Sequence, residues 1–307
     1  MSSTHLQGRT AVVTGAGAGL GRAEALALAA AGANVVVNDM GPAAEDVVSD
    51  IKELGVGAVA VIGDVSDWGI GDRLVSAAVE TFGSLDIVVN NAGITRDTML
   101  FNITEAQWDD VIKIHLKGHA AVSRAAAVHW RAASKAAGGP IYGRIINTSS
   151  EAFLFGSAGQ PNYSAAKAGI TALTLSTAQG LSRYGVTANA ICPRARTEMT
   201  ASVFDADPNT NDLDILAPER VATFVAWLAS PSSAEVNGQV FIVYGDMVAL
   251  MAPPTVEQKF TAADGVFSVD ELAQQVAPYF AGRSPYANFA AYSVAELDTT
   301  GVQNLSH

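Results

Sequence analysis

The segment "TAVVTGAGAGLG" at residues 10–21 joins an apolar run to a glycine-rich turn, and "AEALALAAAG" follows it from Ala23. The apolar run is typical of a buried strand, and the stretch rich in alanine and leucine is typical of a helix. Glycines in such a turn let the backbone approach a pyrophosphate, whose charge the free N–H groups at the helix N-terminus then meet. The spacing of Gly15, Gly19 and Gly21 departs from the GxGxxG dinucleotide pattern, so a tight turn without a ligand is the alternative interpretation.

An acidic residue, Asp39, closes the next apolar run, 18 residues after Gly21. A carboxylate at this point can accept hydrogen bonds from the ribose hydroxyls of adenosine, and it would repel a 2′-phosphate. The neighbouring Ala18 and Met40 are uncharged, so neither offers a cation to that phosphate. The pattern therefore predicts NAD rather than NADP as the cofactor, and the alternative for Asp39 is a solvated turn residue.

Short apolar, β-branched runs recur along the chain. After the first they are "NVVVN" from Asn34, "AVAVI" from Ala58, "DIVVN" from Asp86, "RIINT" from Arg144, "TANAI" from Thr187 and "QVFIV" from Gln239. Segments of helical character lie between them, among them residues 71–83 and 105–137. This alternation implies βαβ units and therefore an α/β fold, a doubly wound parallel sheet of Rossmann type with about seven strands.

We expect residues 1–250 to form a single dinucleotide-binding catalytic domain, because no repeat or proline-rich linker divides them. Residues 251–307 have a different pattern and form a C-terminal extension in this interpretation. Within it, "SVDELAQQVAPYF" from Ser268 and "SVAELDTTG" from Ser293 look like short helices that open on a serine N-cap. The extension is too weakly patterned to fold alone, so we expect it to pack on the domain or on a partner subunit.

The composition limits the class of protein. The 307 residues are 49% apolar and carry a formal net charge of −12, with a pI near 4.7. This acidic balance argues against nucleic acid and against a membrane surface as partners. Cys192 is the only cysteine, no 18-residue apolar run could span a bilayer, and the start lacks signal-peptide regions. We therefore expect a cytoplasmic protein, and we predict no metal site.

The segment "YSAAK" places Tyr163 and Lys167 one helical turn apart, where residues i and i+4 share a face. Together with "TGAGAGLG", "GDV", "NNAG" and Ser150, 13 residues before the tyrosine, it makes the chain resemble the short-chain dehydrogenase/reductase family over about residues 6–250. The resemblance implies that Ser150, Tyr163 and Lys167 are catalytic. The cofactor-binding residues that it implies are Gly15, Gly19, Leu20, Gly21, Asp39, Asp64, Val65, Asn91, Ala92, Gly93, Tyr163, Lys167 and Pro193.

Within the family, the sequence is most similar to the (3R)-hydroxyacyl-CoA dehydrogenase module of multifunctional β-oxidation enzymes and its bacterial stand-alone relatives. The segments "VVVNDMG", "GITRDTMLFNITEAQWDDVIKIHLKG" and "YGRIINTSS" carry this likeness. Two positions depart from the common family pattern, because His115 stands in place of an asparagine and Pro193-Arg194 replaces "PG". His115 is either an ordinary helix histidine or the support of a proton relay. Arg194 and Arg196 either face solvent or meet an anionic substrate.

Oxidation of a secondary alcohol needs a base for the hydroxyl proton, and a tyrosine with an unperturbed pKa of about 10 is a poor one at neutral pH. We expect the Lys167 ammonium to favour the phenolate of Tyr163, with the cationic nicotinamide ring adding to this effect, and to lower the pKa of Tyr163 by about 2 to 3 units. Ser150 would bind the same substrate oxygen. Ser149 competes for that role, and Cys192 is expected to be a small buried hydrophobic residue.

These residues predict an NAD-dependent oxidoreductase acting on a secondary alcohol, either a 3-hydroxyacyl-CoA or a hydroxysteroid. By the resemblance, residues 197–216 form the lid, with Met199, Val203 and Phe204 available to an apolar substrate. The alternatives are an NADPH-dependent 3-oxoacyl reductase and a dinucleotide-binding regulator without turnover. Family members are usually dimers or tetramers, so we also expect a homo-oligomer formed through the long helices at residues 105–137 and 163–184.

Overall fold

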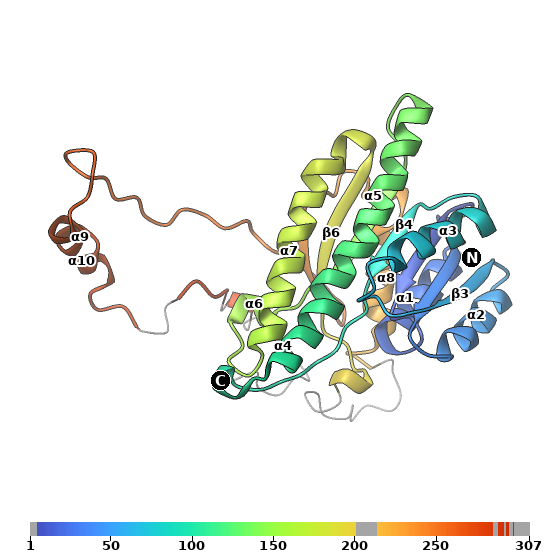
Figure 1. Cartoon of the computed structure of the whole chain (residues 1–307), viewed down its shortest axis with the longest axis horizontal. Coiled ribbons are helices and arrows are strands. Elements are labelled where there is room, and N and C mark those ends of the chain that lie inside the picture. Colours follow the sequence, from blue (N-terminus) through green and yellow to red (C-terminus); the bar gives the residue numbers. More distant parts are fainter. Residues whose placement is uncertain (1–4, 201–213, 285–287, 292, 295–296, 298–307) are drawn as a thin grey trace.

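The computed structural model describes residues 5–200, 214–284, 288–291, 293–294 and 297, and its main body is one eight-stranded sheet covered by helices on both faces (Figure 1). The strand order is β3-β2-β1-β4-β5-β6-β7-β8. The strands are β1 (Thr10–Thr14), β2 (Asn34–Asp39), β3 (Ala58–Ile62), β4 (Ile87–Asn90), β5 (Gly143–Thr148), β6 (Val186–Pro193), β7 (Val240–Tyr244) and β8 (Met247–Leu250). The first seven are parallel, which confirms the doubly wound α/β prediction.

β8 is the strand that the sequence did not predict. It runs antiparallel to β7, with Met247 opposite Tyr244 and Leu250 opposite Phe241. Its residues alternate between half-buried and exposed, whereas β1 and β4 are buried throughout. β8 is a short apolar run, "MVAL", that follows β7 after only Gly245 and Asp246. The sheet therefore has one strand more than the expected seven.

The helices form two layers. They are α1 (Gly19–Ala30), α2 (Ala43–Glu53), α3 (Ile70–Phe82), α4 (Glu105–Ile112), α5 (Gly118–Ala137), α6 (Ala152–Phe155), α7 (Pro161–Leu181), α8 (Pro218–Leu228), α9 (Val269–Gln275) and α10 (Ala277–Phe280). One apolar core joins the sheet to α1, α2 and α8, and a second core joins the opposite face to α3, α5 and the end of α7. In β1, Val13 belongs to the first core and Val12 to the second, because successive side chains point to opposite faces.

The long helix expected at residues 105–137 is interrupted. α4 begins with a capping box in which Thr104 and Gln107 bond to each other's backbone, and it ends at Ile112. A five-residue π-helical segment, Lys113–Lys117, then joins it to α5. Such wide turns are rare in helices and are frequent at functional sites. The expected helical stretch at residues 105–137 is therefore confirmed, and the wide turn within it is not marked by a glycine or proline in the segment.

The order of the strands creates a crevice. β1 pairs with both β2 and β4, so the chain leaves β1 in one direction across the sheet and continues from β4 in the other. Ligands of open α/β sheets bind outside the carboxyl ends of the strands at such a switch point. The glycine-rich turn after β1 and the "NNAG" segment after β4 both lie at this edge of the sheet.

After β8 the chain leaves the main body and later returns to it (Figure 1). Residues 252–284, which we call the arm, project into solvent and carry α9 and α10. Ser268 caps α9 by accepting a hydrogen bond from the Glu271 N–H, so the first helix expected in the extension is confirmed. Of the second expected helix, only Ser293, Val294 and Leu297 are described.

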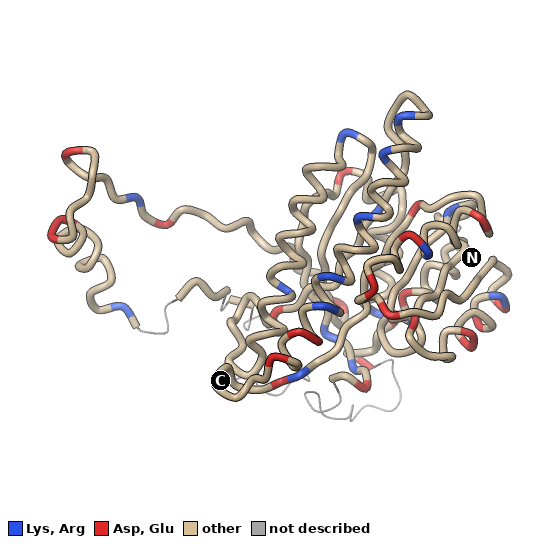
Figure 2. The backbone as a smooth tube through the Cα atoms, in the orientation of Figure 1, with Lys and Arg blue, Asp and Glu red and all other residues tan. Residues whose placement is uncertain are grey.

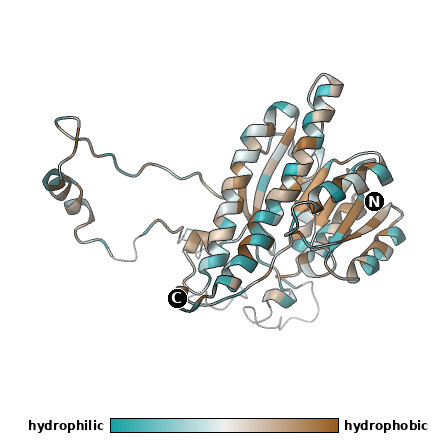
Figure 3. Cartoon of the chain, viewed as in Figure 1, coloured by the Kyte–Doolittle hydropathy of each residue, from teal (hydrophilic) through white to brown (hydrophobic). Residues whose placement is uncertain are grey.

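The described residues of the return segment, 288–291, 293–294 and 297, contact the main body again. The Ala291 N–H donates to the Leu154 carbonyl at 2.9 Å, and Val294 is buried against Cys192, Ile242 and Tyr244. Figure 3 shows that apolar residues dominate the strands and the inner helix faces, while the arm alternates between apolar and polar residues. Within the described residues, no helix has the length and apolar character that crossing a bilayer requires.

Candidate active site

The glycine-rich turn after β1 has a shape that side chains would obstruct. Gly15 has a φ of 62°, and a Cβ atom there would lie 2.8 Å from the Ala92 Cα. A Cβ at Gly21 would overlap the Gly15 carbonyl oxygen and the Asn91 amide nitrogen. α1 starts at Gly19 without a side-chain cap, so its first N–H groups are available to a ligand. The turn therefore offers the backbone donors that a phosphate binds.

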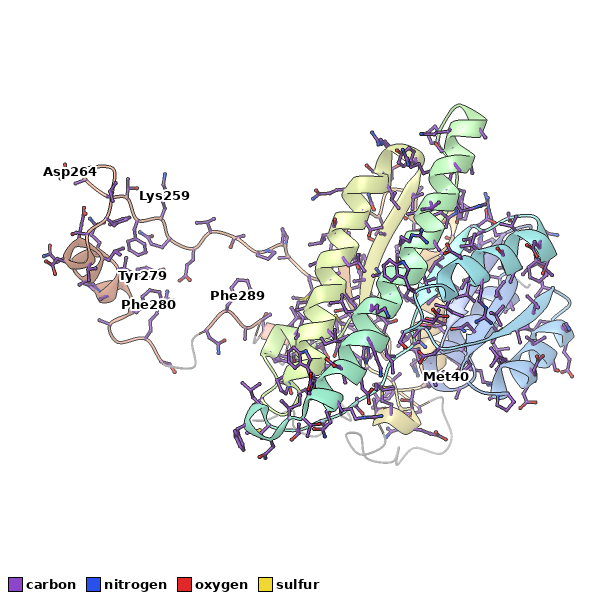
Figure 4. The ribbon with its side chains drawn as sticks, viewed as in Figure 1. Met40, Lys259, Asp264, Tyr279, Phe280 and Phe289 are labelled. Carbon is purple, nitrogen blue, oxygen red and sulfur yellow. The ribbon has the colours of Figure 1, made fainter. Side chains whose placement is uncertain are left out.

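Asp39, at the end of β2, lies beside this turn. Its carboxylate accepts hydrogen bonds from the Gly17 N–H at 2.9 Å and from the Gly41 N–H at 3.2 Å. These two bonds hold the Asp39 carboxylate at the wall of the cavity. The next residue, Met40, also lines the cavity, and its side chain is exposed. Figure 4 labels Met40 on the main body, on the opposite side of the molecule from the arm.

The segment after β4 is tied to the same turn. The Thr14 hydroxyl accepts hydrogen bonds from the N–H groups of Asn91 at 3.0 Å and Ala92 at 3.2 Å. The Asn91 side-chain amide donates to the carbonyls of Thr14 and Gly15, at 3.1 and 3.2 Å. These bonds lock the ends of β1 and β4 together, and they fix the floor of the crevice between them.

A cavity of about 450 Å³ extends from the glycine turn to α7. All the residues predicted to be catalytic or to bind the cofactor line it, except Gly21. Gly21 lies beneath the turn and permits the close packing of α1. Other residues that line the cavity include Asn38, Ile94, Ile114, His115, Thr148, Ala195 and Met199. The sequence did not assign these residues to the cofactor site.

Ser150, Tyr163 and Lys167 converge at the inner end of this cavity. The Lys167 Nζ is buried, donates a hydrogen bond to the Thr148 carbonyl at 2.7 Å, and lies 5.3 Å from the centroid of the Tyr163 ring. Ser150 bonds to the Tyr163 hydroxyl, and its Oγ accepts a hydrogen bond from the Ala152 N–H at 3.2 Å. The i,i+4 spacing on α7 therefore brings the phenol and the amine to one place, as the sequence predicts.

Ser149 has a different position from Ser150. Its buried hydroxyl donates to the Lys167 carbonyl at 3.0 Å and bonds to the Thr171 hydroxyl at 2.8 Å. These contacts join β5 to α7 and leave Ser149 no bond to the Tyr163 hydroxyl among the described contacts. Of the two neighbouring serines, Ser150 is the one beside the phenol.

The expected lowering of the Tyr163 pKa is wrong for the protein without a ligand. Burial raises the pKa of Tyr163 to about 12, and the hydrogen bond with Ser150 opposes this only in part. Burial also lowers the pKa of Lys167 to about 7, so the amine carries only part of its charge near neutrality. Burial thus favours the neutral form of each group, and it outweighs the stabilisation of the phenolate that the spacing suggests.

His115 packs against Tyr163 from the π-helical segment. The two rings meet edge to face with 5.2 Å between their centroids, and the His115 Nε2 lies within hydrogen-bond distance of both the N–H and the carbonyl of Ile94. Burial lowers the pKa of His115 to about 3, so the imidazole is neutral at physiological pH. A Cβ on Gly93 would collide with this ring. His115 thus holds the wall of the cavity in the described structure.

The two arginines of the "PRAR" loop, Arg194 and Arg196, do not extend freely into solvent, because each forms an ion pair within the protein. Arg194 is buried and forms an ion pair with Glu151, at 2.6 Å from Nε to Oε2 and 2.7 Å from Nη2 to Oε1. Arg196 is half-buried and pairs with Asp214 at 2.6 Å. Nothing in the local sequence marks these pairs, because their partners lie 43 and 18 residues away.

The expected lid falls largely outside the described residues. Met199 lines the cavity and is partly exposed, whereas Val203 and Phe204 lie beyond the described part. Cys192 is a buried thiol whose pKa burial raises to about 12. No group of three or more His, Cys, Asp or Glu side chains in the described ranges is arranged to hold a metal ion.

Comparison with known proteins places these features in context. The family model for short chain dehydrogenases matches residues 9–208. The hydroxyacyl-CoA dehydrogenase ChsB1 of Mycobacterium tuberculosis is 56% identical over 298 residues, which is 94% of each chain. The peroxisomal multifunctional enzyme type 2 of Mus musculus is 41% identical over 252 residues, 79% of this chain and 32% of that enzyme.

Two further matches bear on the fold. A 3-oxoacyl-[acyl-carrier-protein] reductase of Synechocystis is 40% identical over 80% of this chain and 99% of the reductase. The crystal structure of a short chain dehydrogenase from Mycobacterium avium superimposes with a TM-score of 0.83 at 45% identity, covering 93% of this chain and 99% of that one. The resemblance drawn from the sequence motifs is confirmed.

Proposed function

The chain belongs to the short-chain dehydrogenase family, and we propose that it oxidises the secondary alcohol of a 3-hydroxyacyl-CoA with NAD as the hydride acceptor. One observation carries the proposal: Ser150, Tyr163 and Lys167 meet in a cavity that continues to the glycine turn and Asp39. The similarity to the hydroxyacyl-CoA dehydrogenase ChsB1 of Mycobacterium tuberculosis supports the same substrate class.

The residues of the cavity fit a dinucleotide. The uncapped start of α1 and the glycine turn would hold the pyrophosphate, because backbone donors are exposed there and a Cβ at Gly15 would fill the cradle. Asp39 would bind the adenosine ribose, and Asp64 and Val65 would border the adenine. The described residues at the Asp39 end of the cavity include no cation for a 2′-phosphate, which favours NAD. When bound, the nicotinamide supplies the hydride acceptor for the alcohol carbon.

The proton chemistry is assigned to Tyr163. Its phenolate would take the proton of the substrate alcohol while Ser150 donates a hydrogen bond to the same substrate oxygen and orients it. Because burial raises the pKa of Tyr163 in the ligand-free protein, the phenolate needs more positive charge than Lys167 supplies alone. The oxidised cofactor carries such a charge, so we expect the pKa of Tyr163 to fall when NAD binds.

Lys167 is assigned a second role at the same place. Its Nζ is held by the Thr148 carbonyl and has further N–H groups for the nicotinamide ribose. A ribose hydroxyl that accepts a hydrogen bond from this amine would replace part of the hydration that burial removes from it. His115 stays neutral in this scheme and positions Tyr163 and Ile94 by contact.

A substrate panel tests the proposal. Purified protein is assayed for NADH formation from NAD with 3-hydroxyacyl-CoAs of several chain lengths and with hydroxysteroids. It is assayed for NADPH consumption with 3-oxoacyl thioesters. We expect oxidation of 3-hydroxyacyl-CoA with NAD, and a loss of about 10²- to 10⁴-fold in kcat for Tyr163→Phe. Faster reduction with NADPH would instead favour a 3-oxoacyl reductase, the class of the Synechocystis relative.

A dinucleotide-binding regulator is the second candidate, motivated by His115 and Arg194 at positions that depart from the family pattern. Calorimetric titration with NADH separates it from the enzyme. If NADH binds while neither the parent protein nor Tyr163→Phe turns over any alcohol of the panel, the enzymatic proposal is wrong.

Two further properties stay predictions: a cytoplasmic location, and a homo-oligomer formed through α4, α5 and α7. Sedimentation at micromolar concentration would test the oligomeric state.

A further inference from the structure

Arg194 and Glu151 lie directly behind the wall of the active-site cavity. The residues on either side of Arg194, which are Pro193 and Ala195, line the cavity, and so does Ser150, the residue before Glu151. The paired side chains stand behind this lining, where that of Arg194 is 4% exposed and that of Glu151 is 10% exposed. The ion pair therefore joins the end of β6 to the loop that carries Ser150.

Buried charges are uncommon in this molecule. Figure 2 shows acidic and basic residues along the helices and loops, and few of them on the strands. Removing a guanidinium and a carboxylate from water is costly, and replacing such a buried pair by apolar side chains often leaves a protein equally stable. Stability alone therefore gives no strong reason to bury Arg194 and Glu151. Their two parallel hydrogen bonds, of 2.6 and 2.7 Å, fix orientation as well as distance.

The turn after Ser150 is tied to α7 next to Tyr163. The Ala152 N–H donates a hydrogen bond to the Ser150 Oγ at 3.2 Å. The Ala152 carbonyl in turn accepts a hydrogen bond at 3.0 Å from the hydroxyl of Ser164, the residue after Tyr163. This turn therefore spaces the Ser150 hydroxyl from the phenol on one side.

The Glu151 carboxylate is the attachment on the other side of the turn, and it is held from the sheet. The guanidinium of Arg194 lies 4.4 Å from the centroid of the Tyr244 ring, and the Arg194 N–H donates to the Val243 carbonyl at 3.0 Å. Both of these partners belong to β7. The position of Glu151, and with it that of the preceding serine, is therefore referred to the rigid strands rather than to another loop.

We propose that Arg194 and Glu151 are positioning residues that hold the Ser150 hydroxyl in the geometry required for hydride transfer. The inference rests on the dehydrogenase function proposed above, in which Ser150 donates a hydrogen bond to the substrate oxygen. The two charged side chains do not touch the substrate in this scheme, and they act through Ser150. Because a misplacement of about 1 Å can lower a rate about 100-fold, loss of the pair should reduce kcat.

A double-mutant cycle with Ser150 tests this role. With NAD and the 3-hydroxyacyl-CoA that the parent oxidises fastest, we expect Arg194→Met to lower kcat about 10- to 100-fold. The dissociation constant for NADH should change less than about threefold, because the glycine turn is untouched. In a Ser150→Ala background the positioned hydroxyl is absent, so Arg194→Met should lower kcat by less than a further factor of about three. An equal loss of kcat in both backgrounds would overturn the proposal.

Combining Glu151→Gln with Arg194→Met separates position from stability. This variant leaves no charge alone in the interior, so it should keep most of the parent's resistance to denaturant. It lacks the two-pronged contact, so its kcat should stay at least about tenfold below that of the parent. A kcat that recovers together with the stability would overturn the proposal, because the pair would then serve only the fold.

Arg9 supplies the matched control. It pairs with Asp86 at 2.8 Å, and its guanidinium lies 3.9 Å from the centroid of the Tyr142 ring, so its partners are of the same kinds as those of Arg194. Arg9 and Asp86 directly precede β1 and β4, at the sheet edge opposite the cavity. Arg9→Met should lower the stability and leave kcat within about threefold of the parent. A loss of kcat equal to that of Arg194→Met would overturn the proposal.

An NMR measurement gives a readout that needs no turnover. The chain has seven tyrosines, so labelling their Cζ atoms with ¹³C gives few signals, and Tyr163→Phe identifies that of Tyr163. Ser150 bonds to the Tyr163 hydroxyl, so Ser150→Ala should shift this signal. We expect Arg194→Met to shift it in the same direction and Arg9→Met to leave it in place.

This measurement also separates the inference from the proposed function. An unmoved Tyr163 signal in Arg194→Met would overturn the positioning role, whether or not the protein oxidises an alcohol. If the expected shift appears while the parent oxidises no alcohol of the panel, the proposed function fails and the positioning of Ser150 by the ion pair stands.

Discussion

Arg194 and Glu151 form a two-pronged ion pair in the interior, and Glu151 is the residue directly after Ser150. The guanidinium also lies 4.4 Å above the centroid of the Tyr244 ring and reaches the Val294 carbonyl at 3.5 Å. One buried side chain thus connects the end of β6, the loop that carries Ser150, β7 and the return segment.

Breaking this pair should cost both stability and turnover. Glu151→Gln leaves the buried Arg194 charge uncompensated, and such a loss costs about 3 to 5 kcal/mol of unfolding free energy. Replacing both partners, as Glu151→Gln with Arg194→Met, should recover a large part of that loss, because no buried charge is left alone. Denaturant unfolding of the single and double variants measures the coupling. Strictly additive losses would contradict the ion-pair interpretation.

Asp39 should determine which dinucleotide binds. In Asp39→Ala combined with Met40→Arg, the carboxylate that would repel a 2′-phosphate is gone and a cation replaces the exposed Met40 side chain. A hydrogen bond to a charged group contributes about 1.5 to 3 kcal/mol, so the ratio of kcat/KM for NAD over NADP should fall by about 10- to 100-fold. Met40→Arg alone serves as the control and should shift the ratio less.

Gly21 should matter for packing rather than for ligand contact. Gly21→Ala places a methyl group against the Gly15 carbonyl and the Asn91 amide, so α1 must move away from the turn. Overpacking of this kind costs about 1 to 3 kcal/mol, and the displaced turn should also bind NADH more weakly. Gly139→Ala, where a Cβ would meet nothing within 4 Å, is the control. Equal thermal unfolding and equal NADH affinity in both variants would show that α1 tolerates the methyl group.

Glu24 should make the protein less stable as the pH rises. It is fully buried on α1, neither carboxyl oxygen has a hydrogen-bond partner among the described residues, and burial raises its pKa to about 8. Between its unfolded pKa, about 4.3, and 8 the folded state holds a proton that the unfolded state releases, so the stability falls with pH. Titration of Glu24 should lower the free energy of unfolding by up to about 1.4 kcal/mol for each pH unit in this range.

Glu24→Gln removes that titration while keeping the shape of the side chain. Its stability relative to the parent should therefore be similar near pH 4 and should increase steadily up to about pH 8. Lys167 acts in the opposite sense at higher pH, because its lowered pKa makes the folded state release its proton first. Urea unfolding between pH 4 and pH 9 measures both trends. A difference between Glu24→Gln and the parent that does not change with pH would exclude a titrating Glu24.

The strands could be predicted from the sequence where a continuous apolar run marks them. Six of the first seven strands are largely buried, and the apolar runs of all seven coincide with strands, including that of β3, which is mostly half-buried at the edge of the sheet. The residues of the motifs also meet as expected, because consecutive parallel strands deliver their carboxyl ends to one edge. β8 and the π-helical segment were missed, since β8 is only a four-residue run placed directly after β7 and the wide turn contains no helix breaker.

The electrostatics of the site depended on burial, which the sequence does not give. The Tyr163–Lys167 spacing suggested a lowered pKa for the phenol, but both groups are enclosed, and their desolvation reverses that direction. The ion pair of Arg194 with Glu151 joins residues 43 positions apart, so it depends on the neighbouring positions of β5 and β6. The burial of Glu24 depends in the same way on how α1 packs, which the local sequence does not show.

The wide turn at Lys113–Lys117 also sets the phase of the helix that follows it. Each residue advances an α-helix by about 100°, and a π-helical turn accommodates one additional residue. Shortening the segment by one residue would rotate all of α5 about its axis by that angle relative to α4. Trp130, now buried with its indole N–H donating to the Leu85 carbonyl at 2.7 Å, would then swing out of the core. The irregular turn beneath Tyr163 therefore also sets which face of the following twenty residues meets the sheet.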